Sequence, residues 1–594
     1  MARSKLSRAA ADPAGSIISV APRQSLVTGW HRYEPIQSAQ HSVQESVLKP
    51  PATLARANTF RVECTLTLRG GRCALGLALL LLQACAFRGP GGGFLREESF
   101  ARMPNAPPEV ARLNDSGAVP GQSGFRILSA GLDGLLARIE VIDTARDTLD
   151  LQYFLFRGDE SGLTVAAALL RAADRGVRIR VIVDDGDTVR GDEKLLALAA
   201  HPKIEMRVFN PFRYRGHIKL IKNLEFILNK GRLDYRMHDK MLVADNTVAL
   251  IGGRNIGDQY FQIDPESQFG DDDVITAGSI VQQLSGVFDE FWNNPLAVPA
   301  RAIDSKHTGD KGLIELRSAA GAEQLQVNAP DSPFSKRFAT GEPLAGVTSG
   351  RTPLVWAKVG LVYDSPNKKD IAAGLRAGNQ IYQAVADKAG AVGVEMLVIT
   401  PYLIPTPDEL ELVKNERSRG ARVRILTNSL ASAPDLAGQA GYMRHRPTFL
   451  KEGVELYEIR PMPGKASGTG QSMSISRHGN YALHAKLFVF DRKSMFIGSM
   501  NFDQRSRRLN TEIGLIIESR ELAEQTAARF DALTQLDNSY TVERIPGGND
   551  KRIGIVWKSR DAGVDKVYTT EPARSGWQRF IVHFLALLPL DSEL

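Results

Sequence analysis

An internal duplication constrains this 594-residue sequence more than any other feature. The nine residues RGVRIRVIV at 175–183 return as RGARVRILT at 419–427. A repeat of this kind predicts related structural units that pack against each other. In both copies, a strand-like apolar run and then a helical stretch precede the repeat, and another apolar run follows it. These segments are 148–156, 163–174 and 204–209 in the first copy, and 396–403, 408–418 and 454–459 in the second.

The order strand, helix, strand in both copies is typical of an α/β fold. Alternating elements predict a mixed β-sheet flanked by helices in each of two lobes, related by a pseudo-twofold axis. Two unrelated α/β domains are the alternative. We expect the lobes to span 123–345 and 346–594, with the active site at the seam between them.

A second repeated pattern makes unrelated domains untenable. His238, Lys240 and Asp245 are followed by Gly252-Gly253-Arg254-Asn255, and His484, Lys486 and Asp491 are followed at the same spacing by Gly498-Ser499-Met500-Asn501. Since one fixed position matches by chance about once in twenty, two collinear copies of a five-position pattern are a strong signal. On a strand, residues i and i+2 face the same side, so the His and Lys of each motif project together.

Apolar runs and turn residues predict that each motif is a β-hairpin. A hairpin symmetric about 246 and 247 places Asn255 opposite His238 and Gly253 opposite Lys240. The second copy likewise places Asn501 opposite His484 and Ser499 opposite Lys486. Small residues facing the lysines would leave room for a phosphate group, and the asparagines offer hydrogen-bond donors. This register depends on the turn type.

The charged side chains point to a phosphodiester substrate without a metal cofactor. Lysines can stabilise the developing negative oxygens, a task that other enzymes give to a metal ion. The acidic triplet 271–273 would either bind a cation or, as we prefer, be solvated or orient a histidine. The three cysteines, Cys64, Cys73 and Cys85, all precede the repeats, so they form no metal cluster or disulfide framework there. The net charge of +7 suits anionic partners.

The paired motifs resemble those of the phospholipase D superfamily, over about 123–594. Segments 210–212, 400–405, 501–506 and 587–594 are most similar to bacterial cardiolipin synthases. The resemblance implies phosphatidyl transfer through a phosphohistidine and no cofactor. Phosphatidylglycerol would be the acceptor, and phosphatidylglycerol or phosphatidylethanolamine the donor. A phospholipase D or nuclease using water is the alternative, and a non-catalytic lipid-binding lipoprotein is disfavoured because both motif copies are complete.

The resemblance also implies individual roles. His238 would attack phosphorus and His484 would protonate the leaving alcohol, while Lys240, Lys486, Asn255 and Asn501 would hold the phosphate. A carboxylate would orient each histidine, and we expect Glu512 and Asp273 to do so. Asp245 and Asp491 belong to the motif, but their place at the turns favours a structural role.

The N-terminal region predicts a lipid anchor. An apolar run behind Arg69 and Arg72 ends in Leu82-Gln83-Ala84-Cys85, which resembles a lipoprotein signal at 66–85 with Cys85 as the lipidated residue. A short buried helix is the alternative. Residues 1–65 are expected to be disordered or not part of the translated protein, with initiation inside 62–68, and 86–122 would be a linker. These features predict a membrane-associated protein on the periplasmic side.

Two further segments suit a membrane surface. Residues 213–232 interleave apolar and basic side chains, which favours either contact with an anionic membrane or an ordinary core helix. At 577–585, Trp577, Phe580, Ile581 and Phe584 have helical spacing, and core packing is the preferred interpretation. We expect anionic phospholipids and the membrane surface as partners, and no stable nucleic-acid partner, because no basic groove with interleaved aromatics is evident. Which proteins it binds is not indicated by the sequence.

Overall fold

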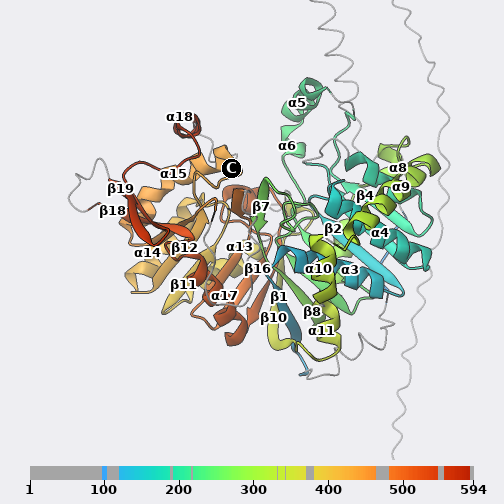
Figure 1. Cartoon of the computed structure of the whole chain (residues 1–594), viewed down its shortest axis with the longest axis horizontal. Helices are drawn as coiled ribbons and strands as arrows, with labels where there is room; N and C mark the ends of the chain where they lie inside the picture. The colour runs from blue at the N-terminus through green and yellow to red at the C-terminus, as the bar shows by residue number, and fades with distance from the viewer. Residues whose placement is uncertain are drawn as a thin grey trace, which may run out of the picture. The chain divides into compact units, whose positions relative to one another are not determined.

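Two sets of strands with the same order carry the duplicated segments (Figure 1). In the first lobe the hydrogen-bonded order is β1 (Ser123–Leu128), β8 (Asp273–Gly278), β6 (Val248–Gly252), β5 (Lys240–Ala244), β2 (Thr148–Tyr153), β3 (Arg178–Asp184), β4 (Ile204–Phe209) and β9 (Ala297–Pro299). In the second it is β10 (Val355–Tyr363), β17 (Ile513–Glu518), β16 (Ser494–Gly498), β15 (Leu487–Phe490), β11 (Glu395–Ile399), β12 (Arg422–Asn428), β13 (Glu455–Ile459), β18 (Ser539–Arg544), β19 (Ile555–Asp561) and β20 (Val564–Tyr568).

The directions of the paired strands repeat as well. From β1 to β9 and from β10 to β18, four antiparallel pairings are followed by two parallel ones and a final antiparallel one. β1 pairs antiparallel with β10, where Gly124 lies opposite Trp356, so the two sets join into one mixed sheet. This arrangement confirms the predicted pair of pseudo-twofold-related α/β lobes.

The computed structural model describes residues 97–102, 119–186, 192–215, 218–330, 332–340, 343–368, 380–462, 480–545 and 554–588. They belong to one unit of the chain, 79–594. The predicted N-terminal extension, the signal segment with Cys85 and most of the linker lie outside the described residues. The predicted boundary at 345/346 falls within α11 (Pro343–Thr348), and the second copy of the strand order begins at β10.

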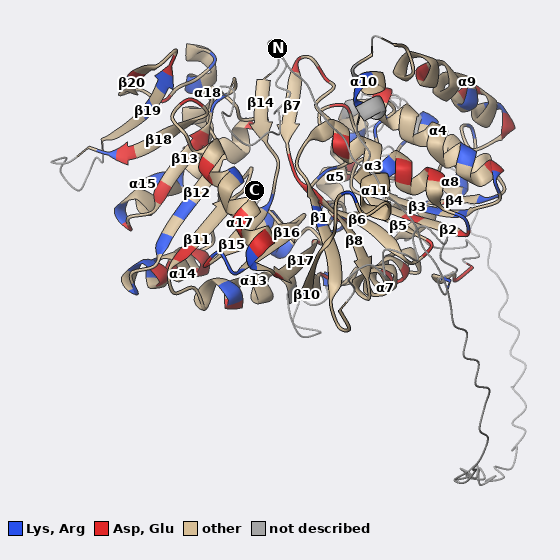
Figure 2. Ribbon diagram, turned by 60° about the horizontal axis from the view of Figure 1, so that its bottom comes forward, with Lys and Arg blue, Asp and Glu red and all other residues tan. Residues whose placement is uncertain are grey.

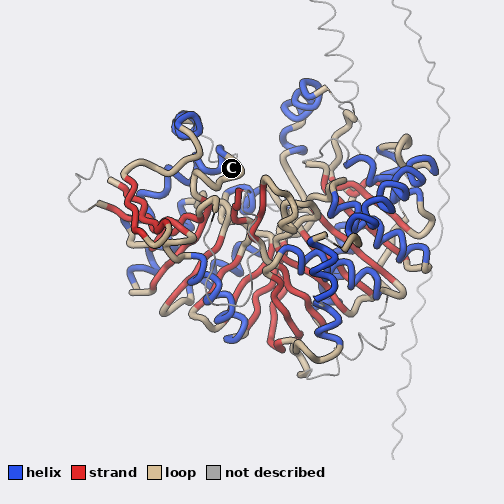
Figure 3. The backbone as a smooth tube through the Cα atoms, in the orientation of Figure 1, coloured by secondary structure: helices blue, strands red, loops and turns tan. Residues whose placement is uncertain are grey.

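Helices flank the strands of both lobes (Figure 3). Those of the first lobe are α3 (Gly131–Thr144), α4 (Glu160–Asp174), η1 (Asp192–Ala200), α5 (Lys219–Leu228), α6 (Lys230–Leu233), α7 (Ile280–Trp292), α8 (Ala300–Ile303), α9 (Asp310–Val327), α10 (Pro333–Thr340) and α11. Those of the second are α13 (Gln380–Gly390), α14 (Pro407–Ser418), α15 (Leu436–Lys451), α16 (Gln504–Arg508), α17 (Arg520–Leu533) and α18 (Gly576–Leu585).

The repeated Arg-Gly pair has a structural reason. α4 and α14 each end just before it, and Gly176 and Gly420 adopt φ angles of 101° and 87°, a region that glycine enters without strain. At the other end, Thr406 and Glu409 cap α14 reciprocally. The chain therefore leaves each helix sharply and enters β3 or β12, which pairs parallel with β2 or β11 and completes the predicted strand, helix, strand order.

Helices α7 and α17 cover the face of the sheet that crosses the seam. Phe288 of α7 and Phe530 of α17 belong to one buried cluster with Ile182, Leu397 and Leu483. Because apolar residues of both lobes share this cluster, burial of apolar surface holds the lobes together. The seam is thus a packed core.

Two helices expose apolar faces. In α18, Trp577 is 68% and Phe580 60% exposed, so the preferred prediction of core packing is wrong for these residues. Helical spacing shows which residues share a face, but the side of α18 that packs is the one carrying Val582, against Leu430 and Ala440. In α5, Leu220 is 76% exposed. Among the described residues, no helix is both long and apolar enough to cross a membrane.

Candidate active site

The two motifs form the hairpins β5–β6 and β15–β16, but in a different register from the predicted one. Met241 pairs with Ile251, and Leu487 with Ile497, whereas the predicted register requires Gly252 and Gly498 at those places. The cause is the turn. Residues 245 and 246, and likewise 491 and 492, all have φ angles between 49° and 52°. Ala244 pairs with Val248, and Phe490 with Ser494, so each turn contains three residues, and this odd number shifts the pairing by one.

The motif aspartates shape these turns. Asp245 accepts hydrogen bonds from the backbone N–H groups of Arg146, Asp147 and Thr148, at 2.8–2.9 Å. Asp491 does the same for the N–H groups of 393–395, at 2.8–3.1 Å. Burial opposes ionisation of Asp491, but these three donors lower its pKa below the ordinary value. Both side chains therefore tie a hairpin turn to the start of a neighbouring strand, as their position in the sequence suggested.

Two strand contacts across the seam place the histidines. β7 (Ser267–Gly270) of the first lobe runs parallel to β14 (Asn480–Leu483) of the second, and they stand side by side in Figure 2. Asp271 directly follows β7, and His484 directly follows β14. A parallel bridge between Met237 and Thr511 repeats this arrangement in reverse, ahead of His238 and Glu512. Each strand contact thus places a histidine of one lobe next to a carboxylate of the other.

His238 is held by its backbone and by its ring. Its N–H donates to the Thr511 carbonyl at 3.0 Å, and its Nδ1 lies 2.9 Å from Glu512 Oε2. The ring of Phe154 meets the imidazole edge to face at 5.1 Å. Burial, and then the charges of Lys240 and Lys486, lower the pKa of His238 well below its usual value. The imidazole of His238 is therefore neutral.

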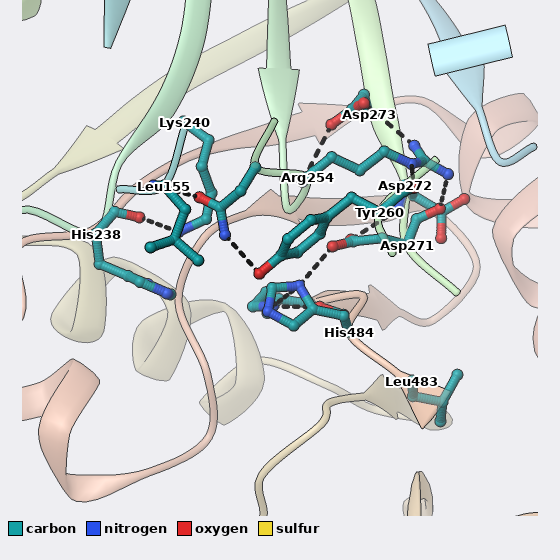
Figure 4. A network of polar contacts seen from close by, with 12 residues as sticks. Leu155, His238, Lys240, Arg254, Tyr260, Asp271, Asp272, Asp273, Leu483 and His484 are labelled. Carbon is teal, nitrogen blue, oxygen red and sulfur yellow. Dashed lines mark hydrogen bonds and ion pairs between the residues drawn. The ribbon is translucent and has the colours of Figure 1, made fainter. Parts of the chain in front are cut away.

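His484 has a similar setting with a closer carboxylate. Its Nδ1 lies 2.6 Å from Asp271 Oδ2, and Figure 4 shows the ring directed at that side chain. Phe269 stacks on the imidazole at 5.3 Å, and Tyr260 meets it edge-on at 5.0 Å. Burial and the Lys486 ammonium, 2.8 Å from Nδ1, lower the pKa of His484 to about 3. Both histidines are thus neutral.

The prediction that Asp273 orients a histidine is wrong, and Asp271 has that position. Asp273 lies opposite Gly252 in the β6–β8 pairing, while Gly514 lies opposite Gly498 in the second lobe. Counting two residues back from these partners makes Asp271 the equivalent of Glu512. The strand-like run that begins at Val274 in one copy and Leu515 in the other is the signal that could have aligned them.

The other two aspartates of the triplet have different partners. Asp273 pairs with Arg138 at 2.9 Å and with Arg254 at 3.1 Å. Asp272 accepts from Ser129 Oγ at 2.5 Å and pairs with Arg529 at 3.3 Å. All three carboxylates are buried, so of the two roles preferred for the triplet, solvation is wrong and orientation of a histidine holds for Asp271. Among the described residues, no group of three or more His, Cys, Asp or Glu side chains is arranged to hold a metal ion.

Gly253 and Ser499 lie against the carboxylates of Asp271 and Glu512, and they do not face the lysines as predicted. A Cβ at Gly253 would lie 2.1 Å from Asp271 Oδ1, so glycine is what lets this carboxylate approach. At the equivalent place, the Ser499 hydroxyl donates to Glu512 Oε2 at 2.5 Å. A second donor, not predicted from the sequence, is Ser506, whose hydroxyl donates to Glu512 Oε1 at 2.6 Å. The two carboxylates therefore have different surroundings.

These surroundings give the carboxylates different pKa values. Burial raises the pKa of Glu512 to about 7, despite the opposing charge of Lys240 and the two serine donors. Burial alone would also raise the pKa of Asp271. The interactions with Lys486, His484 and Arg254 outweigh this effect and hold the pKa of Asp271 well below the ordinary value. Asp271 is therefore a fixed negative charge, while Glu512 titrates near neutrality.

The lysines bring positive charge to the same site. Burial lowers the pKa of Lys240 to about 7 and that of Lys486 to about 8. The Lys240 ammonium donates to the His238 carbonyl at 2.5 Å, and Lys486 donates to the His484 carbonyl. The charge of Lys486 also lowers the pKa of Lys240. The two motifs therefore act on each other electrostatically within one site.

The motif asparagines differ in their contacts. Asn255 accepts from the Leu155 N–H at 3.2 Å and donates to the Tyr260 hydroxyl at 2.9 Å. Asn501 Oδ1 is buried and has no hydrogen-bond partner among the described residues. Of the two motif asparagines, Asn501 is thus the one whose side-chain oxygen lacks a partner among the described residues.

Two more residues, not predicted from the sequence, support Glu512. Lys368 donates to Asp364 at 2.8 Å and to the carbonyls of Ser506 and Asn510, both at 2.6 Å. The Glu512 N–H in turn donates to Asp364 at 3.2 Å. This buried ion pair fixes the loop that carries Glu512. A lysine so far from both motifs gives no local sequence signal.

A duplicated α/β unit that joins two His-x-Lys hairpins in one buried site defines a class of phosphodiester-processing proteins, and comparisons with known proteins agree. A family described as "Cardiolipin synthase, PLD-like domain" matches residues 139–292 and 388–534. The chain therefore belongs to the phospholipase D-like family of cardiolipin synthases.

Individual relatives extend the match. Cardiolipin synthase C of Escherichia coli (strain K12) is 35% identical over 80% of this chain and 96% of its own length. The major cardiolipin synthase of Bacillus subtilis (strain 168) is 22% identical over 73% of each chain. A crystal structure of phosphatidylserine synthase from Haemophilus influenzae aligns with 70% of this chain and 87% of its own, at 14% identity and a TM-score of 0.48.

Proposed function

We propose that this chain makes cardiolipin by moving a phosphatidyl group onto a hydroxyl of phosphatidylglycerol. The donor is a second phosphatidylglycerol or phosphatidylethanolamine. The observation that carries the proposal is the meeting of both motifs at one buried site, in a chain whose family is that of the cardiolipin synthases. A site with two neutral imidazoles and two ammonium groups suits an anionic phosphodiester.

In the first step, Nε2 of His238 attacks phosphorus, and the bond from phosphorus to the head-group oxygen breaks. His484 gives its proton to that oxygen, which leaves as glycerol or ethanolamine. In the second step, the acceptor hydroxyl attacks the phosphohistidine, its proton passes to His484, and the phosphorus–nitrogen bond breaks. Lys240 and Lys486 stabilise the negative oxygens of both transition states.

The two carboxylates support this assignment of roles. A general acid must be protonated when substrate is bound, and the fixed negative charge of Asp271 favours an imidazolium at His484. A nucleophile must stay neutral, and Glu512, with a pKa of about 7, offers His238 less negative charge. Because burial and the lysines lower the pKa of both imidazoles, the negative charge of the phosphodiester would supply the further stabilisation that a protonated His484 needs.

The reaction is tested with purified protein and vesicles that contain labelled phosphatidylglycerol, with or without phosphatidylethanolamine. Mass spectrometry of the lipids should show labelled cardiolipin, which His238→Ala and His484→Ala should not form. Phosphatidic acid as the sole product would replace this proposal with the alternative, a phospholipase D that uses water.

The order of the histidines has its own test. A substrate with an activated leaving group needs little protonation, so His484→Ala should still form an acid-labile labelled adduct. His238→Ala should form none. Label found only in His238→Ala, and mapped to His484, would reverse the two roles.

We also propose that a lipid-modified Cys85 holds the protein to the membrane on the periplasmic side. The support is the sequence Leu82-Gln83-Ala84-Cys85 behind an apolar run, together with the lipid substrate. Cell fractionation should find the wild-type chain with the membranes and Cys85→Ala largely released. Unchanged fractionation and unmodified Cys85 in mass spectrometry would refute the anchor.

A further inference from the structure

We infer that α5 and α18 together form a docking surface for an anionic lipid bilayer. Each lobe contributes one of the two helices, and both project from the same edge of the unit, at the top of Figure 1. β7, which leads directly into Asp271, lies between them in that view. The inference deepens the proposed function, on which it rests only for the choice of lipid.

The exposed faces have the composition of interfacial helices. On α5 the exposed apolar side chains recur at helical spacing: Leu220, Leu224, Ile227 and Leu228. On α18 they are aromatic, with Trp577, Phe580 and Phe584 on one face, and Trp577 stacks on Phe580 at 5.3 Å. Apolar side chains of this size, grouped and left in water, mark an interaction surface. Tryptophan and phenylalanine on a helix with a separate polar face suit the interfacial zone of a bilayer.

The charge beside these apolar faces indicates that an anionic bilayer binds there. α18 contains no acidic residue. Arg574, just before the helix, and Arg579, within it, donate to the backbone carbonyls of Ala431 and Glu571, which leaves their charge uncompensated by those contacts. In α5 the one acidic residue, Glu225, accepts from the backbone N–H groups of Arg213 and Tyr214. Basic charge around apolar faces complements anionic head groups.

The packing of α18 shows why its apolar face is free. Val582 is buried against Leu430 and Ala440, which secures the opposite side of the helix to the second lobe. The hydroxyl of Ser575 caps its first turn by accepting from Gln578 N–H at 3.0 Å. α18 is therefore folded before it meets a membrane, and docking needs no further ordering of this helix.

Vesicle binding tests the inference, with full-length protein that carries Cys85→Ala throughout so that no acyl chain contributes. One variant changes Leu220, Leu224 and Ile227 to Ser, another changes Trp577, Phe580 and Phe584 to Ser, and a third combines both sets. Ile314→Ser with Leu325→Ser is the matched control, because these α9 side chains are similarly exposed. Sedimentation is measured with vesicles of phosphatidylcholine alone and with added phosphatidylglycerol.

We expect each set to weaken binding to phosphatidylglycerol-containing vesicles at least tenfold, the combination to abolish it, and the control to leave it unchanged. Brominated lipid should quench fluorescence in the Cys85→Ala chain but less in Trp577→Phe. Full binding by the combined variant would overturn the inference. So would an oligomer that the same substitutions convert to a monomer, since a second copy would then cover the surface. Vesicle binding through these helices without any transferase activity would retain the docking surface and refute the proposed function.

Discussion

The carboxylate of Asp271 lies 2.6 Å from Nδ1 of His484, although the two residues belong to opposite lobes. Glu512 and His238 form the reciprocal contact at 2.9 Å. Each lobe therefore supplies one reacting imidazole and the carboxylate that orients the other one. A substitution in the first lobe should consequently change the chemistry of a histidine in the second.

Asp271→Asn should lower kcat by roughly 10²–10⁴-fold, by analogy with the loss of an orienting carboxylate beside a catalytic histidine. If His484 is the general acid, a substrate with an activated leaving group should recover most of this loss. Steady-state kinetics with an alkyl and a nitrophenyl phosphodiester make the measurement. Equal losses with both substrates would contradict the role of Asp271.

Asp273→Asn is the matched control for that experiment. Asp273 binds Arg138 and Arg254 and contacts neither histidine, so its loss should lower the thermal midpoint of unfolding. The folded fraction should keep a kcat within a few-fold of the wild-type value. A selective loss of kcat in Asp273→Asn, with normal stability, would return the orienting role to Asp273.

The plot of kcat/KM against pH should be bell-shaped and narrow. Lys240 and Lys486, with pKa values of about 7 and 8, lose their positive charge as the pH rises through that range. Glu512, with a pKa of about 7, is protonated below it and then accepts the Nδ1–H of His238 less well. Because kcat/KM reports the free enzyme, a water-soluble substrate should reveal both limbs. A flat profile up to the range of an exposed lysine, about pH 10, would contradict the buried environment of the ammonium groups.

Ser499 and Gly253 offer a test of the asymmetry between the copies. Ser499→Gly removes one donor to Glu512. A hydrogen bond to a charged group contributes roughly 1.5–3 kcal/mol, so we expect turnover to slow by roughly ten- to a hundredfold and the acid limb to shift upward in pH. Gly253→Ser places a Cβ against the Asp271 carboxylate and should cost far more activity. Equal tolerance of both changes would show that the carboxylates are not positioned as described.

Asp245→Ala should reduce stability and leave the chemistry intact. It removes the acceptor of three backbone N–H groups and favours a different φ at the turn, so the free energy of unfolding should fall by roughly 2–4 kcal/mol. Asp245→Asn keeps an acceptor and tolerates left-handed backbone, and should lose less. Thermal unfolding and kcat per folded molecule separate the effects. A catalytic role would require a fall in kcat at unchanged stability.

The sequence was sufficient to predict those elements whose signal is local or repeated. Apolar runs around 148–156 and 396–403 correspond to β2 and β11, and the helix before each Arg-Gly pair ends at that pair. The hairpins were predicted because alternating residues and turn residues specify them. Their register was not, since it depends on the number of residues in each turn, which is three at 245–247 and at 491–493.

Long-range contacts account for the other differences. Asp271, Asp272 and Asp273 are chemically alike, and only the pairing of β8 with β6 decides which one reaches His484. Lys368 supports Glu512 through the loop that ends at Asn510, a contact without any local pattern. The aromatic face of α18 has the same periodicity whether it meets a core or solvent. Tertiary partners, which periodicity does not encode, decided these cases.

The crossed pairing of histidines and carboxylates also limits how this chain can be recombined. A chimera that takes its first half from one relative and its second half from another would combine each imidazole with a carboxylate selected for a different partner. Gly253 and Asp271 lie in the first half, and Ser499 and Glu512 in the second. The contacts of the two carboxylates with the histidines, however, cross from one half to the other. Natural exchange of halves between distant relatives should therefore be rare, and laboratory shuffling of this fold should succeed best when Asp271 moves together with His484, and Glu512 with His238.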